Sequence, residues 1–153
     1  MMADALSAAH EAAQAGEVPV GAAVFDCAGR LLARAGNNVE GGRNPAGHAE
    51  ILALTAACRA VGSARLPGHI LVVTLEPCLM CAGAIGHSRI DGVVFGAFDT
   101  IAGALVSVAD RPNLPLAGRS FWHLGGIRST ECASLLAQFF SHRRDPLNQK
   151  LHA

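Results

Sequence analysis

Two short motifs constrain the fold of this chain more strongly than any other part of its sequence. They are His48-Ala49-Glu50 and Pro77-Cys78-Leu79-Met80-Cys81, and one predicted helix and one predicted strand separate them. Imidazole nitrogen and cysteine sulfur often bind the same metal ion. The two motifs meet at one site only if the starts of two helices reach the same edge of a sheet. This requirement favours an α/β fold.

Hydrophobic periodicity predicts elements in the order α-β-β-α-β-α-β-β-α. The predicted helices cover residues 3–15, 46–61, a segment opened by Pro77, and 130–142. The predicted strands cover residues 19–26, 30–37, 69–75, 91–97 and 120–124. Ala28-Gly29 is a turn signal, so the first two strands are expected to form a hairpin. Residues 98–118 are predicted to be a loop, and a polar tail follows residue 142. Because strands and helices alternate in the second half, we expect a partly parallel sheet with helices on both faces.

Composition excludes intrinsic disorder, because hydrophobic residues make up 51% of the chain and charged residues 16%. The N-terminal segment carries Asp4 and Glu11 and has no basic region, unlike a signal peptide. The five cysteines are odd in number and unevenly spaced, which argues against a secreted disulfide framework. We therefore expect a cytoplasmic protein.

Charge is unevenly distributed although the formal net charge is zero. The first 29 residues hold four acidic and no basic residues, which leaves 12 basic against eight acidic residues in the rest. Eleven of the 12 basic residues are arginine, which forms bidentate contacts with phosphate. The neutral total argues against an indiscriminate nucleic-acid binder, whereas the distribution permits a specific one.

Cys78 and Cys81 lie three residues apart at a predicted helix start, which places both sulfurs on one face. The helix start also favours the thiolate form. Together with His48 they make three ligands of a tetrahedral ion and leave the fourth position open, as in catalytic zinc sites. Sulfur with imidazole selects zinc over magnesium or calcium.

Glu50 distinguishes a hydrolytic site from a structural one. Zinc lowers the pKa of a bound water to about 7, and a nearby carboxylate then accepts and redelivers its proton. Taken alone, the cysteine pair also fits a redox dithiol. The combination of His-x-Glu with Pro-Cys-x-x-Cys is typical of zinc-dependent nucleobase deaminases.

Further stretches extend this pattern over nearly the whole chain. They are residues 17–22, Asn37, 48–51, 74–84, 87–90, 93–97 and 131–133, with Phe139-Phe140 and Arg143-Arg144. With them the sequence resembles the bacterial tRNA-specific adenosine deaminases of the TadA type, in the cytidine deaminase-like superfamily. The resemblance implies that residues 1–153 form a single zinc-dependent deaminase domain. It also implies a three-layer α/β/α sandwich with a mixed five-stranded sheet, and a homodimer.

The same resemblance implies conversion of the wobble adenosine to inosine in a tRNA anticodon stem-loop. Asn37 would then hydrogen-bond the target base, and the backbone N–H of Ala49 would help to hold it. Without the resemblance, Asn37 reads as a turn residue at a strand end.

The chain departs from the family pattern at three places. Gly47 replaces an alanine, Ile101 replaces a lysine, and Gly118-Arg119 replaces Asn-His. These changes leave two alternatives open: a deaminase of a free base or nucleoside such as guanine or cytosine, and a zinc-stabilised RNA-binding scaffold. Glu50 argues against the scaffold, which has no use for a spare carboxylate. Arginines 43, 89, 119, 143 and 144 are candidates for replacing the lost charge.

Overall fold

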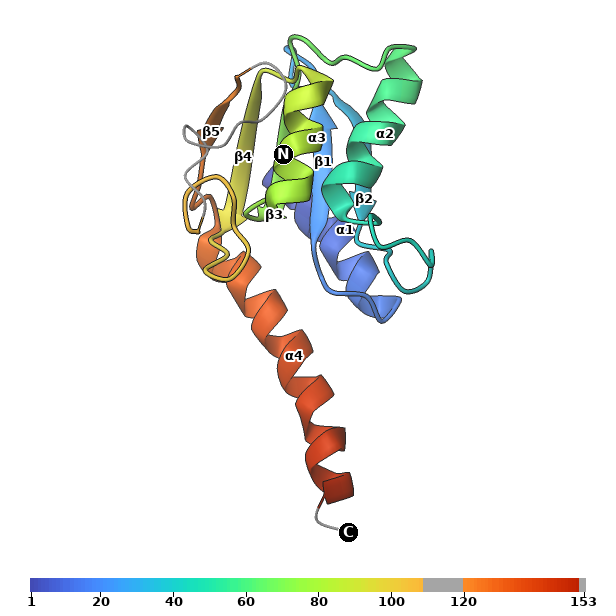
Figure 1. Cartoon of the computed structure of the whole chain (residues 1–153), viewed down its shortest axis with the longest axis vertical. Coiled ribbons are helices and arrows are strands. Elements are labelled where there is room, and N and C mark those ends of the chain that lie inside the picture. The colour runs from blue at the N-terminus through green and yellow to red at the C-terminus, as the bar shows by residue number, and fades with distance from the viewer. Residues whose placement is uncertain (109–119, 152–153) are drawn as a thin grey trace.

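A computed structural model describes residues 1–108 and 120–151, with the backbone alone for 144–151. Gly118, Arg119 and the Arg144 side chain lie outside the described part. The elements are α1 (Met2–Gln14), β1 (Gly21–Phe25), β2 (Leu31–Gly36), α2 (Ala49–Val61), β3 (Ile70–Leu75), α3 (Leu79–Ser88), β4 (Gly92–Ala97), β5 (Trp122–Leu124) and α4 (Ser129–Leu151) (Figure 1). This is the predicted order of helices and strands.

The five strands form one mixed sheet in the order β2-β1-β3-β4-β5. β1 is antiparallel to both β2 and β3, whereas β3, β4 and β5 are parallel to one another. The two parallel connections, β3 to β4 and β4 to β5, bring the carboxyl ends of these strands to one edge. The prediction of a mixed five-stranded sheet is confirmed.

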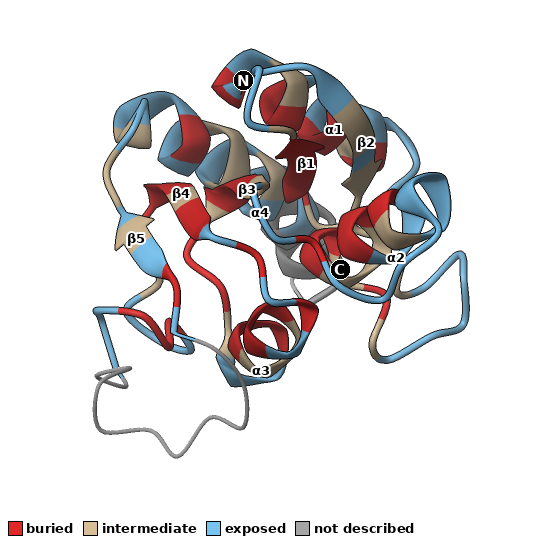
Figure 2. Cartoon of the chain, turned by 90° about the horizontal axis from the view of Figure 1, so that it is seen from above, coloured by how far each residue is buried: buried red, intermediate tan, exposed pale blue. Residues whose placement is uncertain are grey.

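Alternating side chains of the central strands divide the apolar core into two clusters. Val24 and Val73 pack with residues of α2 and α3 on one face, whereas Phe25 and Val72 pack with residues of α1 and α4 on the other. Figure 2 shows the buried strands between these two layers of helices. A period of two along each strand produces this division. The predicted three-layer sandwich is confirmed.

Two predicted helix starts were wrong. α2 begins at Ala49 rather than near residue 46, because Asn44 closes a turn: its side chain accepts a hydrogen bond from Ala46 N–H (3.0 Å), and its carbonyl accepts one from Gly47 N–H (2.9 Å). α3 begins at Leu79 rather than Pro77, and the Pro77 carbonyl instead accepts a hydrogen bond from Ala104 N–H (2.9 Å). His48 and Cys78 are therefore N-cap residues of the two helices.

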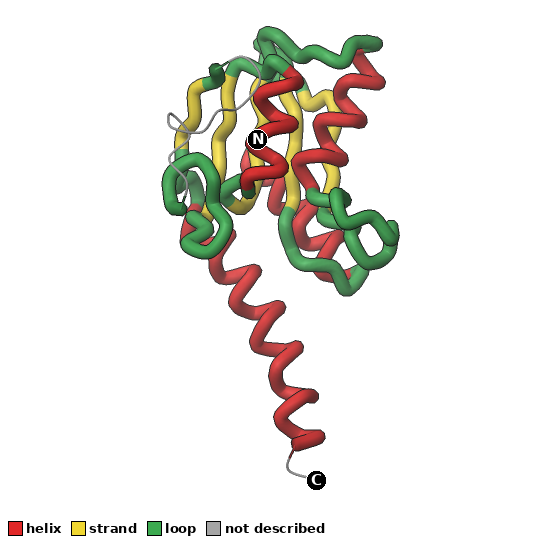
Figure 3. The backbone as a smooth tube through the Cα atoms, in the orientation of Figure 1, coloured by secondary structure: helices red, strands yellow, loops and turns green. Residues whose placement is uncertain are grey.

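The last helix is longer than predicted, because α4 continues to Leu151 instead of ending near residue 142. Its second half extends beyond the edge of the sheet (Figure 1). Two large loops, 37–48 and 98–108, lie at the edge where α2 and α3 begin (Figure 3). Among the described residues, no helix is both long and apolar enough to cross a membrane.

Candidate metal centre and active site

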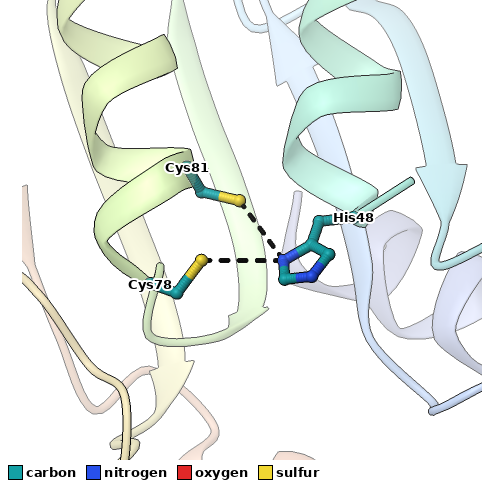
Figure 4. A group of neighbouring side chains, drawn as sticks. All are labelled: His48, Cys78 and Cys81. Carbon is teal, nitrogen blue, oxygen red and sulfur yellow. Dashed lines mark hydrogen bonds between the residues drawn. The ribbon is translucent and has the colours of Figure 1, made fainter. Parts of the chain in front are cut away.

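The three predicted metal ligands come together at the starts of α2 and α3. His48 and Cys78 both have extended backbone, with φ and ψ of −70° and 148° for His48 and −73° and 174° for Cys78. His48 Nδ1 lies 3.6 Å from Cys78 Sγ and 3.5 Å from Cys81 Sγ (Figure 4). All three donor atoms lie within 4.8 Å of one another.

This donor set fits a zinc ion. Tetrahedral zinc with a Zn–N distance of about 2.0 Å and a Zn–S distance of about 2.3 Å requires nitrogen and sulfur ligands about 3.6 Å apart. The two N···S separations of 3.6 and 3.5 Å meet that requirement. Two sulfurs with one imidazole favour zinc over magnesium or calcium.

The two neighbouring cysteines shift each other's pKa in opposite directions. The Cys81 thiol donates a hydrogen bond to Cys78, and this lowers the pKa of Cys78 to about 5. The same contact, together with burial, raises the pKa of Cys81. Because both thiols must lose their protons to bind zinc, metal binding releases a proton from Cys81.

Glu50 lies in the first turn of α2 and is only 4% exposed. Burial raises the pKa of its carboxyl from 4.5 to about 7, and the charge of Cys78 adds to the increase. A carboxyl group with this pKa exchanges a proton readily near neutral pH. Glu50 therefore has the burial and the pKa that general acid–base catalysis requires.

A cavity of about 320 Å³ joins the predicted site residues. His48, Glu50, Cys78 and Asn37 all line it. Asn37 follows the last residue of β2, and its backbone N–H donates to the Val20 carbonyl (2.9 Å). Ala49 is the first residue of α2, so its N–H has no acceptor within the helix. The structure thus brings Asn37 into one cavity with His48, Glu50 and Cys78, whereas Ala49 is fully buried and does not line that cavity.

Comparison with known proteins agrees with this geometry. The family profile described as "Cytidine and deoxycytidylate deaminase zinc-binding region" matches residues 1–97. The tRNA-specific adenosine deaminase of Bacillus subtilis is 40% identical over 143 residues, which cover 94% of this chain and 88% of the relative. That of Agrobacterium fabrum is 41% identical over 140 residues, which cover 92% and 91%. The chain belongs to the family of tRNA-specific adenosine deaminases.

One solved structure agrees with this assignment, and a second has the same fold. A structure from a study of A-to-I editing by tRNA:A34 deaminases at the wobble position of transfer RNA is similar to this chain, with a TM-score of 0.84 and 39% sequence identity. The match covers 88% of this chain and 97% of that structure's chain. A guanine deaminase from Nitrosomonas europaea matches with a TM-score of 0.79 and 28% identity, covering 90% and 81%.

Two buried carboxylates that sequence reasoning did not assign to the site hold the loops beside the cavity. Glu17 accepts hydrogen bonds from the backbone N–H groups of Val39 (3.1 Å) and Gly41 (2.7 Å). Glu76 accepts them from the N–H groups of four residues of the other loop, Asp99, Leu105, Val106 and Ser107, and from the Ser107 hydroxyl. Both carboxylates line the cavity of the deaminase.

The sequence signal for these carboxylates is weak. Glu17 precedes the first strand, and Glu76 follows the third strand directly before Pro77. An acidic residue beside an apolar strand is a candidate anchor for a loop. These carboxylates find their donors only when loops 22 to 31 residues away fold onto them.

The departures from the family pattern have local structural consequences in this deaminase. Gly47 is buried, and a Cβ there would lie 2.5 Å from the Asn38 carbonyl oxygen.

Ile101 is 88% exposed on the 98–108 loop. It lines a second hollow of about 350 Å³ with Phe98, Leu136 and Phe140. Val18, Leu75, Asp99 and Ala102 line both this hollow and the cavity, so the two adjoin.

Proposed function

We propose that this deaminase converts adenosine to inosine at the wobble position of a tRNA anticodon loop. The observation that carries the proposal is the buried Glu50 carboxyl in a cavity that it shares with His48 and Cys78, whose donor atoms converge with that of the buried Cys81. The relatives named above, which cover more than nine-tenths of the chain, support the substrate. A cytoplasmic location follows from this function.

The reaction replaces the amino group on C6 of adenine with oxygen and releases ammonia. His48, Cys78 and Cys81 would hold zinc, which when bound supplies an activated water at neutral pH. Glu50 takes a proton from the attacking water and passes it to the ring nitrogen. It then takes the second proton of that water from the new C6 hydroxyl group and delivers it to the amino group, whose bond to C6 breaks, so water is consumed and ammonia is formed.

Asn37 and Ala49 are the proposed binding groups for the base. The Asn37 side chain reaches the cavity from the end of β2, and the Ala49 N–H faces the start of α2. Each provides a directional hydrogen bond without a net charge, which suits a neutral purine. The anticodon loop presents an unstacked base, so little energy is needed to place it in the cavity.

The surroundings of the cavity favour a nucleic acid over a free base. Phe98, Ile101 and Phe140 form an exposed apolar surface next to it, and Arg143 lies at the cavity itself. Aromatic side chains beside a cation are typical of surfaces that bind single-stranded nucleic acids. The alternative is a free-base deaminase, which the structural match to the guanine deaminase favours.

An assay with matched substrates tests the proposal. One stem-loop carries adenosine at the wobble position, and a second carries the same adenosine one position away. Free adenosine, guanine and cytosine are assayed in parallel, with Glu50→Ala as the negative control. We expect inosine only from the first stem-loop, and weaker binding as salt increases. Turnover of a free base with both stem-loops inert would assign the alternative function.

We also propose that the deaminase acts as a homodimer. A largely apolar groove of about 660 Å³ lies between α2 and α3, lined by residues that include Ile51, Leu54 and Ala84. Leu79 and Met80, at the start of α3, are exposed. Sedimentation equilibrium is expected to give twice the chain mass, and Ala84→Arg, which places a charge in the groove, is expected to give the single-chain mass. A wild-type chain that sediments as a monomer would exclude the dimer.

A further inference from the structure

Glu17 is a carboxylate with little solvent contact and several donors. It is only 4% exposed, although it lies in the short connection between α1 and β1. Its Oε1 accepts the Gly41 N–H, and its Oε2 accepts both the Val39 N–H and the side-chain amide of Asn37 (3.4 Å). The Gly41 N–H, with the other donors, holds the pKa of this carboxyl below its usual value. Glu17 is therefore a permanent acceptor at neutral pH.

A permanent acceptor determines which way the Asn37 amide is oriented. An asparagine side chain has an NH₂ group and a carbonyl oxygen of nearly the same shape, and their hydrogen-bond partners decide which of the two faces which way. Because a carboxylate only accepts, the NH₂ group must face Glu17. One N–H of Asn37 is used by Glu17. Within the described part of the chain, its second N–H and its carbonyl oxygen have no further side-chain hydrogen bond, so both can serve a ligand in the cavity.

The backbone around Asn37 is held just as firmly. Asn37 N–H donates to Val20, and Asn38 N–H donates to the Gly47 carbonyl (2.9 Å). Gly47 directly precedes His48 and packs against Asn38 too closely to admit a Cβ. The backbone on both sides of the Asn37 side chain is thus held, by Val20 and by Gly47 next to the predicted ligand His48. What can still rotate is the side-chain amide of Asn37.

We propose that Glu17 is a positioning residue that orients the Asn37 amide toward the substrate base. The proposal rests on the proposed function, in which Asn37 contacts the base. Glu76 provides the matched comparison, because it is similarly buried beside the same cavity. Among the described residues, its hydrogen-bond donors are backbone N–H groups and the Ser107 hydroxyl, and none is a proposed substrate-binding side chain.

A double-mutant cycle tests the coupling between the two side chains. Glu17→Gln keeps the size of the side chain but can offer its own NH₂ to Asn37, so the orientation of the Asn37 amide is no longer determined. We expect KM for the wobble-adenosine stem-loop to rise roughly ten-fold, with a smaller change in kcat. In an Asn37→Ala background the same substitution should raise KM several-fold less, because only the loss of its hydrogen bonds to the Val39 and Gly41 N–H groups remains. Glu76→Gln should have the same effect with and without Asn37→Ala.

Nuclear magnetic resonance of the side-chain amides gives a second measurement that needs no turnover. The Asn37 NH₂ signals are those that disappear in Asn37→Asp. We expect Glu17→Gln to shift them and speed their exchange with water, and Glu76→Gln to leave them in place.

The outcomes separate the inference from the proposed function. An equal effect of Glu17→Gln in both Asn37 backgrounds, or unchanged Asn37 NH₂ signals, would overturn the positioning role. If the stem-loop is inert but a free base reacts, the proposed substrate fails, and the cycle run with that base together with the NH₂ signals still decides the role of Glu17. If no substrate reacts, the NH₂ signals alone decide it.

Discussion

The floor and the walls of the cavity are built in different ways. The floor consists of His48, Glu50, Cys78 and Cys81, which all lie at the caps or first turns of α2 and α3. The walls are the loops 37–48 and 98–108, each held by one buried carboxylate, Glu17 or Glu76. The floor supplies reactive groups through short-range motifs. The walls supply position through hydrogen bonds between distant parts of the chain.

The largest effect is expected at the floor, from loss of a metal ligand. Cys81→Ser replaces a buried sulfur with a weaker zinc ligand, so zinc retention after dialysis should fall below about a tenth of wild type. Deamination should fall to background with it. Metal analysis and the stem-loop assay measure both, and Cys58→Ser, away from the three donor atoms, is the control. Full activity of a zinc-free Cys81→Ser protein would show that the reaction does not depend on a metal held by the floor.

Glu50→Gln tests proton transfer without removing a ligand. We expect kcat to fall roughly 100- to 10,000-fold while zinc is retained, because glutamine is nearly the same size but carries no exchangeable carboxyl proton. Single-turnover kinetics with metal analysis measures this. A variant that kept the wild-type rate would exclude Glu50 as the proton carrier.

The same substitution has a pH-dependent effect on the metal-free protein. Since burial raises the pKa of Glu50 from 4.5 to about 7, the folded state binds a proton more tightly than the unfolded state, and the stability of the wild type falls as pH rises through this range. Glu50→Gln should therefore be more stable than wild type above pH 7, by about 3 kcal/mol at most, and equal to it near pH 4. Urea unfolding at both pH values checks this, and a difference that did not depend on pH would contradict it.

Glu76→Gln tests the wall formed by the 98–108 loop. The glutamine NH₂ group would face backbone N–H donors that now lack an acceptor, which should cost about 1–3 kcal/mol of unfolding free energy. Burial raises the pKa of Glu76, but the Ser107 hydroxyl and the backbone donors lower it below its usual value overall. The stabilisation is present above pH 4.5 and is lost as pH falls below it. Urea unfolding of wild type and variant at pH 7 and pH 3 should show a larger difference at pH 7 than at pH 3.

Gly47→Ala tests the other wall, at a cost comparable to that of Glu76→Gln. The new Cβ would lie 2.5 Å from the Asn38 carbonyl oxygen, which is a backbone atom, so the loop must shift, at a cost of about 1–3 kcal/mol and with a few-fold rise in KM. Gly83→Ala is the matched control, because nothing lies within 4 Å of a Cβ there and alanine favours a helix. Thermal unfolding of both variants measures the contrast. Equal stabilisation by both would show that the Asn38–Gly47 contact places no constraint on the wall.

Sequence patterns located the elements well but not their ends. The strands were predicted within two residues of their observed bounds, because apolar alternation marks the buried segment directly. The helix starts near His48 and Cys78 were less accurate, because hydrogen bonds of Asn44 and Pro77 to neighbouring residues and to Ala104 decide where each helix begins. Polarity suggested that the last helix ends near residue 142, whereas α4 runs to Leu151.

The sequence by itself determined the order of the elements, the ligand set His48, Cys78 and Cys81, and the candidate proton carrier Glu50. Local spacing encodes which residues are candidates, since caps and first turns fix their place on each helix, whereas the fold brings His48 to Cys78 and Cys81 across 30 and 33 residues. Only the tertiary structure decided that Glu17 and Glu76 hold the walls and that Asn37 has a defined side-chain orientation. Those features depend on hydrogen bonds across 20 to 31 residues, and a carboxylate in a sequence does not reveal which distant donors it will meet.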